Sequence, residues 1–514
     1  MRIAFRVDAS LGSGLGHLQR CISLALALRK LGATPVFVIR KTDIEVGPQL
    51  ASFGFQTFEL PAAEFRRGSL DIDDPPLAAW AGTTWRADSK DTIDVLAKSP
   101  PDWLIVDHYS FDARWHATVA RAMDLCVAAI DDLADRPLDV SLLIDQNIAE
   151  SHWCKYRGLL SSRTTLLGGP RFALLGPSFR DSAKYEFHEQ VRSIGVFMGG
   201  VDAANLSSRV VHACREDAGF AGAIEVVTTR FNPNKSSLRE FATRWPETVI
   251  TEDLPDLAGF FARHDLQIGA GGGASWERAA IGAPSLLLIS ADNQRVVVNA
   301  LARLGAAVTA DISDRVPADY LGASIANLIR DPVIRKDLGE RARRLVDGLG
   351  AHRVALCLLN KQLEVRPARV DDTELMYEWR NDSRTRAVSL DPALLDHAKH
   401  FDWVKQTLSN PNRCLLVGQI GQLPVGVIRF DKLHADSAEI SLYLNPDLYG
   451  LGLGSALLRA GERFFSGDNK NRTEFVATVL SGNSPSEKLF ESCGYLFDRG
   501  RWHKSIAFPS GGEN

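Results

Sequence analysis

The feature that most constrains the fold is a series of short apolar runs in which polar and apolar residues do not alternate. Strands of this kind are buried on both faces, which is typical of parallel sheets covered by helices. Segments with helical spacing of apolar residues lie between the runs, most clearly over 18–31. The pattern therefore predicts an α/β fold. The expected strands are 3–7, 35–39, 103–107, 127–130, 142–144, 193–198, 225–229, 266–270 and 285–289.

The pattern along the chain predicts three domains. A polar stretch without periodicity, 176–190, separates the first five expected strands from the other four. This division predicts a GT-B-like pair of Rossmann lobes, 1–180 and 181–350, with a cleft between them. The pattern changes after Leu363, where a strand and a helix are followed by two strands around a turn at Gly421. We therefore expect a third domain, of the α+β class, over 363–508.

Composition excludes several classes of protein. The formal net charge of −4 gives no sign of a nucleic-acid or membrane-surface partner. No apolar stretch approaches the roughly 20 residues of a membrane-spanning helix, and the first residues resemble a strand rather than a signal peptide. The seven cysteines lie far apart, which favours a reducing compartment over a disulfide framework or a structural zinc site. We expect a cytoplasmic protein, and its oligomeric state stays open.

A glycine-rich loop joins the first expected strand to the first helix and ends at His17. Gly12, Gly14 and Gly16 let backbone N–H groups approach a ligand closely, and the start of the helix favours negative charge. The spacing matches neither the GxGxxG dinucleotide fingerprint nor a Walker loop. At this position the helix macrodipole favours a neutral imidazole, which suits a general base. A histidine that only caps the helix or packs the loop is the alternative.

A second glycine turn, 269–273, precedes a short helix in the second series of strands. Its backbone N–H groups are expected to bind a diphosphate at the start of the helix that contains Ser275. Glu277, in the first turn of that helix, is expected to accept both hydroxyls of a ribose. Asn293 and Gln294 open the next helix and are expected to hold a sugar ring. A helix-capping serine beside a surface glutamate is the alternative.

A third turn, Gly199-Gly200-Val201-Asp202, follows the first strand of the second series and is expected to face the same cleft. With these turns, residues 1–350 resemble the UDP-2,4-diacetamido-2,4,6-trideoxy-β-L-altropyranose hydrolases of pseudaminic acid biosynthesis, which are GT-B-fold relatives of the MurG glycosyltransferases. The matching stretches keep the family order across both halves. They are 6–10, 14–21, 106–109, 130–136, 145–147, 169–175, 199–202, 271–277 and 293–294.

The resemblance implies a hydrolysis that inverts the sugar and needs no metal. In that family the histidine of the Gly-x-Gly-His loop is the proposed general base, which activates a water that attacks C1 of the sugar and releases UDP. That role falls on His17. Asp8, at the end of the first strand, is expected either to orient His17 or to contact the sugar. The predicted substrate site comprises Gly14, Gly16, Arg20, Tyr109, Asn147, Gly199, Gly200, Asp202, Gly271, Gly272, Ser275, Glu277, Asn293 and Gln294.

Another glycine-rich turn, 449–455, follows the expected strand 438–444 in the C-terminal third. Its backbone N–H groups, at a helix N-terminus, are suited to bind a pyrophosphate. Asn483 then begins a second helical segment that ends at Gly494-Tyr495. This pairing is similar to the GNAT acetyltransferases, which implies acetyl-CoA as the co-substrate. The resemblance assigns acetyl-CoA binding to Leu444, Gly450, Leu451, Gly452, Leu453, Gly454, Ser455, Asn483 and Ser486.

Trp379-Arg380-Asn381-Asp382 and His400-x-x-Trp403, with Arg369, look like the GNAT subgroup that acetylates the 4-amino group of the same altrose nucleotide. Two positions depart from the GNAT pattern. Tyr449 stands where the loop usually begins with Gln or Arg, and Phe490 stands where many relatives have a tyrosine general acid. The proton donor for the departing thiolate is therefore unassigned.

Glu439 and Tyr443, on the strand before the glycine turn, are candidates for handling the amine proton. A structural role for either residue is the alternative. Together these features predict a bifunctional enzyme. The C-terminal domain would N-acetylate a UDP-4-amino-4,6-dideoxy-altrose derivative, and the N-terminal lobes would then release UDP from the diacetamido product.

Two other functions compete with this prediction. In the first, the lobes form a glycosyltransferase that uses a UDP-sugar, with an appended acyltransferase module. In the second, the C-terminal domain is a CoA-sensing or scaffold module that does not catalyse transfer. The expected partners are a UDP-linked amino sugar and acetyl-CoA, with no metal, no nucleic acid and no membrane.

Overall fold

The computed structural model describes residues 1–62, 74–245, 247–289, 294–310, 320–434, 436–467 and 473–506. The chain divides into two compact units, Met1–His352 and Arg353–Asn514. Among the described residues, no helix combines the length and the apolar character that crossing a membrane requires.

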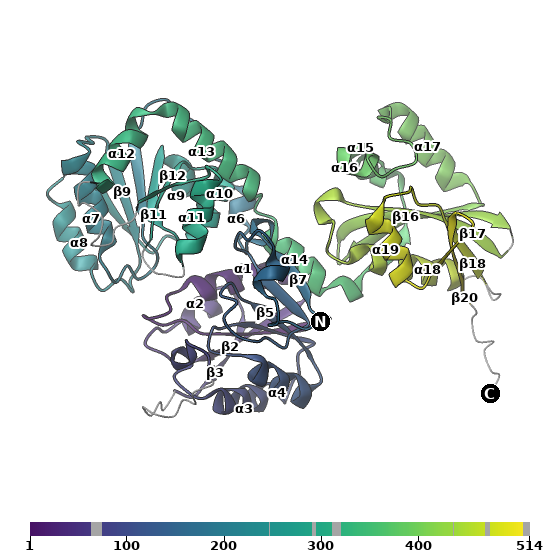
Figure 1. Ribbon diagram of the computed structural model, residues 1–514, viewed down its shortest axis with the longest axis horizontal. Coiled ribbons are helices and arrows are strands. Elements are labelled where there is room, and N and C mark those ends of the chain that lie inside the picture. The colour runs from purple at the N-terminus through teal and green to yellow at the C-terminus, as the bar shows by residue number, and fades with distance from the viewer. Residues whose placement is uncertain are drawn as a thin grey trace. The chain divides into compact units, whose positions relative to one another are not determined.

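The first unit contains two parallel sheets (Figure 1). In the part of the chain that is described, the first sheet has the strand order β3-β2-β1-β4-β5-β6-β7. Neighbouring strands pair in parallel throughout. Its strands are β1 (Arg2–Val7), β2 (Thr34–Arg40), β3 (Gln56–Leu60), β4 (Trp103–Asp107), β5 (Cys126–Ile130), β6 (Leu142–Asp145) and β7 (Thr165–Gly168). Its helices are α1 (Gly16–Lys30), α2 (Gly47–Ser52), α3 (Trp85–Leu96), α4 (Ala113–Met123) and α5 (His152–Lys155).

The second sheet has the order β10-β9-β8-β11-β12-β13 over the described ranges, again with parallel neighbours. Its strands are β8 (Ser193–Phe197), β9 (Ala223–Thr228), β10 (Thr248–Glu252), β11 (Leu266–Ala270), β12 (Ser285–Leu288) and β13 (Val308–Ala310). The helices from this part of the chain are α6 (Ser178–Asp181), α7 (Leu206–His212), α8 (Lys235–Ala242), α9 (Ala258–Arg263), α10 (Ala274–Ile281), α11 (Arg295–Arg303), α12 (Tyr320–Arg330), α13 (Pro332–Leu345) and α14 (Gly350–Leu358).

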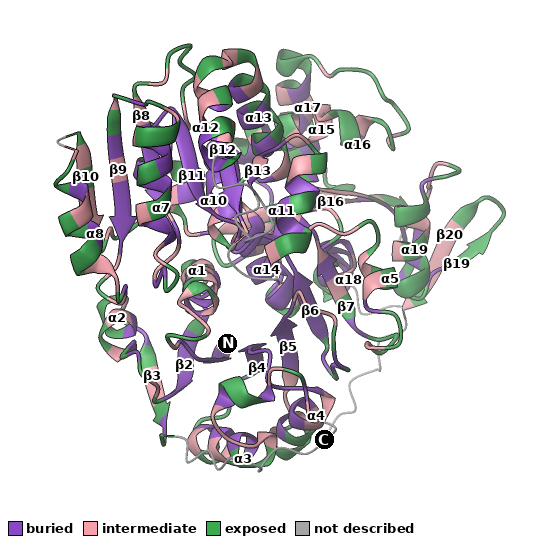
Figure 2. Cartoon of the chain, turned by 60° about the vertical axis from the view of Figure 1, so that its left-hand side comes forward, coloured by how far each residue is buried: buried purple, intermediate pink, exposed green. Residues whose placement is uncertain are grey.

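Both sheets follow the Rossmann strand order, in which the first strand lies between the second and the fourth. The predicted GT-B-like pair of Rossmann lobes is therefore confirmed, whereas the predicted boundary near residue 180 stays a prediction. The central strands are buried, as Figure 2 shows in purple. In sheets of this order, ligands bind outside the carboxyl ends of the strands, where the strand order reverses. Those positions lie between β1 and β4 in the first sheet and between β8 and β11 in the second.

Among the described residues of this unit, four strands were not expected from the sequence, and each of them is an edge strand. β3 and β7 border the first sheet, and β10 and β13 border the second. Their residues are partly exposed, so they lack the continuous apolar runs that identify a strand buried on both faces.

The second unit contains a mixed sheet, whose order over the described residues is β14-β15-β16-β17-β18-β20-β19. Pairing is antiparallel except between β17 and β18. The strands are β14 (Glu364–Pro367), β15 (Arg413–Ile420), β16 (Leu423–His434), β17 (Ser437–Leu444), β18 (Thr473–Ala477), β19 (Leu496–Asp498) and β20 (Arg501–Ile506). The helices are α15 (Thr373–Asn381), α16 (Ser383–Arg386), α17 (His397–Ser409), α18 (Leu453–Gly467) and α19 (Ser484–Ser492).

The parallel strands β17 and β18 diverge halfway along. Their pairing ends where Ile440 faces Ala477, yet β17 continues to Leu444 against β16. β18 ends at Ala477, and the chain then leaves the sheet towards α19. The divergence leaves the last four residues of β17 without a partner on that side, next to the glycine turn that opens α18.

Candidate functional site

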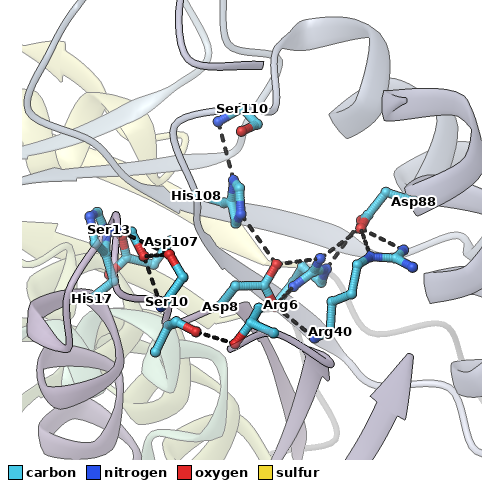
Figure 3. Close-up of polar contacts among 12 residues, drawn as sticks. Arg6, Asp8, Ser10, Ser13, His17, Arg40, Asp88, Asp107, His108 and Ser110 are labelled. Carbon is cyan, nitrogen blue, oxygen red and sulfur yellow. Dashed lines mark hydrogen bonds and ion pairs between the residues drawn. The ribbon is translucent and has the colours of Figure 1, made fainter. Parts of the chain in front are cut away.

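A pocket lies at the carboxyl ends of β1 and β4, where a Rossmann sheet is expected to bind its ligand. β1 leads into Asp8 and the glycine loop, and β4 ends at Asp107 and leads into His108. Figure 3 shows these side chains close to His17 and to one another. The residues lining the pocket are Asp8, Ser10, Ser13, His17, Thr42, Trp80, Asp107, His108 and Tyr109.

His17 lies in the first turn of α1 and is paired with Asp107. Its Nδ1 atom is 2.6 Å from Oδ1 of Asp107, whose side chain is fully buried. Burial raises the pKa of the Asp107 carboxyl, but the charges of Arg20 and His17 outweigh it and hold that pKa well below its usual range. Asp107 is therefore a carboxylate and only accepts hydrogen bonds, so Nδ1–H of His17 is the donor. In a neutral ring, this leaves Nε2 free to accept a proton.

Arg20 lies one turn along α1 from His17 and donates hydrogen bonds to the same carboxylate. Its Nε donates to Oδ2 of Asp107 and its Nη2 donates to Oδ1, both at 2.6 Å. The Arg20 side chain is 11% exposed, and its Nη2 is also 3.1 Å from Nδ1 of His17. The sequence placed Arg20 in the substrate site. In the structure, its guanidinium is engaged with the partner of the candidate base.

Asp8 does not contact His17, so the expectation that Asp8 orients this histidine is wrong. Its Oδ1 accepts from Nη1 of Arg6 at 2.6 Å and from the backbone N–H of Arg40 at 2.7 Å. Its Oδ2 accepts from Nη2 of Arg6 at 2.8 Å and from Nε2 of His108 at 3.2 Å. Four donors use the acceptor capacity of a carboxylate. Protein groups thus occupy the oxygens with which Asp8 was expected to contact a sugar.

Asp8 is held by a buried network of ion pairs, whose arginines do not line the pocket. Arg6 is fully buried and also donates to Asp88 through Nη2 at 2.6 Å. Arg40 donates to Asp88 at 2.8 Å and to Asp91 at 2.9 Å. Burial raises the pKa of Asp8, but Arg6 and His108 outweigh it and hold that pKa below its usual range. Removal of one member of such a buried set costs about 3–5 kcal/mol, because it leaves a charge unpaired.

His108 is a residue of the pocket that the sequence placed only in a matching stretch and gave no role. Its Nδ1 accepts the backbone N–H of Ser110 at 3.2 Å, so the ring proton is on Nε2 and faces Asp8. The ring stacks on Phe111 with a centroid separation of 4.5 Å. These contacts fix both the tautomer and the plane of the ring. The signal in the sequence was its position directly after a strand that ends at the sheet's reversal point.

Tyr109 and Asn147, both expected to bind substrate, meet at Asp132. The Tyr109 hydroxyl donates to Oδ1 of Asp132, and Nδ2 of Asn147 donates to Oδ2 at 2.9 Å. The Tyr109 ring stands edge-on to the His17 ring, with centroids 4.7 Å apart. Arg20 Nη1 is 3.8 Å from Oδ2 of Asp132. Tyr109 therefore packs beside the candidate base, and Asn147 supports it through a shared carboxylate.

The glycine loop is closed on itself by two serines. Ser10 and Ser13 each accept a hydrogen bond from the other's backbone N–H, at 3.0 and 3.1 Å. Gly14, with a φ of +75°, donates its N–H to the Ser10 carbonyl at 2.8 Å. A side chain at Gly14 would be strained in this left-handed conformation. Gly16 follows as the first residue of α1.

The turn after β8 lies against this loop. A Cβ atom at Gly200 would be 2.9 Å from Cδ1 of Leu15, so the glycine permits the close approach. Gly199 has a φ of +92°, which favours glycine. Asp202 was expected to bind substrate, but its carboxylate caps α7 by accepting the N–H groups of Leu206 at 2.8 Å and Ser207 at 3.1 Å.

The turn after β11 packs closely against α11 and the residue before it. At Gly271, a Cβ atom would overlap with the side chain of Val298, and at Gly272 it would be 3.6 Å from Nε2 of Gln294. Within the described ranges, the buried Oγ of Ser275 has no hydrogen-bond partner. Burial raises the pKa of Glu277, in the first turn of α10, to about 7. Asn293 lies outside the described residues.

Arg278 is a buried residue next to this turn. It was not identified from the sequence. It is buried, and it donates to the carbonyl of Ala270 at 3.2 Å and to that of Phe197 at 2.9 Å. These carbonyls end β11 and β8, so Arg278 ties together the two strands that flank the crevice. Gly269 leaves room for it, because a Cβ atom there would overlap with the guanidinium. A buried arginine near a glycine turn has no distinctive sequence pattern.

In the second unit, the glycine turn lies where β17 and β18 diverge. Gly450 and Gly452 have φ angles of +83° and +73°. Among the described residues, no protein acceptor takes the backbone N–H of either glycine. At Gly454, a Cβ atom would overlap with the side chain of Leu489, so a glycine is needed where α18 meets α19. Leu444 ends β17, the side chains of Leu451 and Leu453 are buried, and Ser455 lies in the first turn of α18.

The helix α19 begins with the capping residue Asn483. Its side-chain oxygen accepts the backbone N–H of Ser486 at 3.3 Å, so part of its capacity is used within the protein. Phe490 is buried and packs against Tyr495, with ring centroids 5.0 Å apart, and against Trp502. The position where many GNAT relatives carry a general acid is therefore part of the apolar core.

The two candidates on β17 differ in their surroundings. Glu439 lies one residue before the divergence, and its Oε1 accepts the hydroxyl of Thr478 at 3.0 Å. Tyr443 packs against the apolar core, and burial raises the pKa of its hydroxyl well above the usual value. Side chains four residues apart on a strand point to the same face. Glu439 is the better candidate for a proton acceptor, because burial keeps the Tyr443 hydroxyl protonated.

No group of three or more His, Cys, Asp or Glu side chains is arranged to hold a metal ion in the described part of the chain.

Known proteins resemble this chain in its C-terminal domain, in part of its length and over almost its whole length. Residues 362–496 match the family described as the acetyltransferase (GNAT) domain. The spore coat polysaccharide biosynthesis protein SpsG of Bacillus subtilis is 27% identical over 204 residues, which cover 39% of this chain and 60% of SpsG. An uncharacterized protein of Methanocaldococcus jannaschii, MJ1062, is 19% identical over 520 residues, which cover 96% of each chain. The crystal structure of MurG from Acinetobacter baumannii superposes with a TM-score of 0.46 and 14% identity, covering 69% of this chain and 98% of MurG.

The second unit thus contains a GNAT acetyltransferase domain, and the resemblance stated for it from the sequence is confirmed at that level. A GNAT domain implies the use of acetyl-CoA. The divergent strands and the glycine turn at the start of α18 agree with such a domain. The chain spans only 60% of the length of SpsG, whose name concerns polysaccharide biosynthesis.

Proposed function

We propose that the chain is a bifunctional enzyme that acts on a UDP-linked amino sugar. The GNAT domain transfers an acetyl group from acetyl-CoA to the 4-amino group of a UDP-4-amino-4,6-dideoxy-altrose derivative. The two Rossmann lobes then hydrolyse the product, UDP-2,4-diacetamido-2,4,6-trideoxy-β-L-altropyranose, to the free sugar and UDP. The single observation that carries the hydrolytic half is the His17–Asp107 pair, which faces a pocket at the reversal point of a Rossmann sheet.

In the hydrolytic step, Nε2 of His17 accepts a proton from a water while the water oxygen forms a bond to C1 of the sugar. The bond between C1 and the UDP oxygen breaks, its electron pair leaves with UDP, and the sugar is inverted. Asp107 then stabilises the imidazolium through the 2.6 Å hydrogen bond from Nδ1. General-base catalysis of this kind contributes about 10²- to 10⁴-fold to the rate.

The UDP group is proposed to occupy the turn after β11. Backbone N–H groups at the start of α10 and the unpartnered Oγ of Ser275 are suited to a diphosphate. Glu277, as a carboxylate, is suited to accept both ribose hydroxyls. Gln294, whose Nε2 is 3.6 Å from where a Cβ atom of Gly272 would lie, is proposed to contact the sugar or the phosphates.

In the acetyl transfer, the amine nitrogen attacks the thioester carbonyl and a C–N bond forms, while the C–S bond breaks and its electron pair leaves with CoA as a thiolate, which takes a proton from water. Glu439 accepts the amine proton, directly or through water, at the point where β17 and β18 diverge. Backbone donors at Gly450 and Gly452 hold the pyrophosphate of acetyl-CoA.

Mass spectrometry of the products tests this proposal. The whole chain is incubated with the UDP-4-amino sugar, first with acetyl-CoA and then without it. We expect a gain of one acetyl group followed by loss of UDP, without any added acceptor. Acetylation without UDP release in water, and UDP release only when an acceptor sugar is added, would identify a glycosyltransferase instead. Binding of acetyl-CoA without any acetyl transfer would identify the second unit as a sensor.

A further inference from the structure

The side chains of His17, Arg20 and Asp107 contact one another near the N-terminus of α1. His17 and Arg20 lie one turn apart on the helix, and both contact Oδ1 of Asp107 at 2.6 Å. Arg20 makes a second hydrogen bond to Oδ2, so the carboxylate and the guanidinium face each other as a bidentate pair. The Asp107 side chain is fully buried, and those of His17 and Arg20 are 13% and 11% exposed. Solvent therefore screens these interactions only weakly.

The charge of Arg20 changes what Asp107 does to His17. A lone buried carboxylate beside an imidazole favours the protonated ring. An imidazolium cannot accept a proton, so a ring that is protonated more often acts as a base in a smaller fraction of molecules. The guanidinium of Arg20 balances the carboxylate, and its Nη2 is only 3.1 Å from Nδ1 of His17, which disfavours a second positive charge there.

Four other titratable groups lie near His17 or Arg20, and none of these four is hydrogen-bonded to Nδ1 of His17. The Tyr109 ring stands against it from the loop after β4, and burial raises the pKa of the Tyr109 hydroxyl, so that group stays neutral. Asp132, in the loop after β5, is 3.8 Å from Arg20 and is held by the Tyr109 hydroxyl. Asp8 and His108 line the same pocket but are bonded to each other.

We propose that Arg20 is a positioning residue of the hydrolytic site, which holds Asp107 in line with Nδ1 of His17 and balances its charge so that His17 stays an uncharged proton acceptor. This inference rests on the proposed hydrolysis and assigns Arg20 a role other than substrate binding. It requires that Arg20 disfavours the protonated form of the His17 ring and that Asp107 favours it.

The test is an NMR titration of the histidine rings in the whole chain, with His17 assigned by its loss in His17→Gln. We expect Arg20→Gln to raise the pH at which His17 loses its proton by about one to two units. Asp107→Asn should lower it by a similar amount, and the double variant should titrate near the wild type. Lys30→Gln removes a positive charge from the last turn of the same helix and should leave the midpoint unchanged. A wild-type midpoint in Arg20→Gln would overturn the proposal.

A kinetic measurement separates positioning from substrate binding. If Arg20 positions Asp107, the acidic limb of kcat/KM against pH, which reports the free enzyme, moves to higher pH in Arg20→Gln by the same amount as the titration midpoint. If Arg20 binds the substrate instead, KM rises and the limb stays in place, which contradicts the proposal. Arg20→Lys keeps the charge but loses the paired hydrogen bonds, so it provides a second variant should Arg20→Gln fail to fold. It should keep the midpoint near that of the wild type and lower kcat.

The titration needs no substrate, so it remains decisive if the proposed reaction is wrong. Failure of the wild-type chain to release UDP would overturn the proposed hydrolysis. A shifted midpoint in Arg20→Gln would still establish the coupling among Arg20, Asp107 and His17.

Discussion

Asp107→Asn is the substitution that most directly probes how the proposed base is held. The carboxylate accepts from His17 and Arg20 through Oδ1 and from Arg20 again through Oδ2. An asparagine has one oxygen and one NH₂ group, so it cannot satisfy all three donors. With the NH₂ group towards His17, it donates to Nδ1, and the ring proton moves to Nε2. With the NH₂ group towards Nε of Arg20, two donors face each other at a distance of 2.6 Å.

The expected loss follows from the hydrogen bond. A charge-assisted hydrogen bond contributes about 1.5–3 kcal/mol, which is about 10- to 150-fold in rate when it stabilises the imidazolium of the transition state. The wrong ring tautomer lowers the rate further. We expect kcat for UDP release to fall about 100- to 1,000-fold, with KM changed less than about threefold because both oxygens of the buried Asp107 are already engaged by His17 and Arg20.

The assay is chromatographic measurement of UDP from the diacetamido UDP-sugar, with thermal unfolding as a check on folding. Asp102→Asn, just before the other end of β4, is the matched control and should keep wild-type kcat. A kcat for Asp107→Asn within about threefold of the wild type would refute the role of Asp107.

Three further predictions concern the other sites. The affinity for uridine, which has no phosphate, should fall about tenfold from pH 8 to pH 6, because the pKa of Glu277 is about 7 and only its carboxylate accepts the ribose hydroxyls. Calorimetry on Glu277→Gln should show no such dependence, and an equal slope in both proteins would refute the assignment. Glu439→Gln should lower acetyl transfer about 10²-fold or more without changing UDP release, and unchanged transfer would remove it as the proton acceptor. Gly454→Ala should lower the free energy of unfolding by about 1–3 kcal/mol, because its Cβ overlaps with Leu489, and an unchanged urea midpoint would contradict that packing.

The sequence predicted the architecture because continuous apolar runs and glycine turns are local signals. The buried strands β1, β4, β8 and β11 were expected, and so were the turns that follow β1, β8 and β11. The edge strands β3 and β10 were missed, because their exposed residues break the apolar pattern. Asn293 is outside the described residues, so its expected contact with the sugar remains a prediction.

The partner of His17 illustrates what local signals do not contain. Asp8 is nine residues from His17 and Asp107 is ninety residues away, so the sequence favoured the nearer carboxylate. Only the strand order places β4 beside β1 and brings Asp107 to Nδ1. The same order lets Arg6 and Arg40 enclose Asp8. Pairing across the sheet, rather than proximity along the chain, therefore determines which acid acts on the base.

Hydrolysis in ¹⁸O-labelled water tests most directly whether His17 activates a water to attack C1 of a UDP-sugar. The wild-type protein is mixed in molar excess with the diacetamido UDP-sugar, so that each enzyme molecule turns over at most once. The masses of both products are then measured by mass spectrometry. The label should appear in the sugar and not in UDP, at a rate that His17→Ala lowers by about 10²- to 10⁴-fold. Label in UDP, or an equal rate in His17→Ala, would contradict the proposed mechanism.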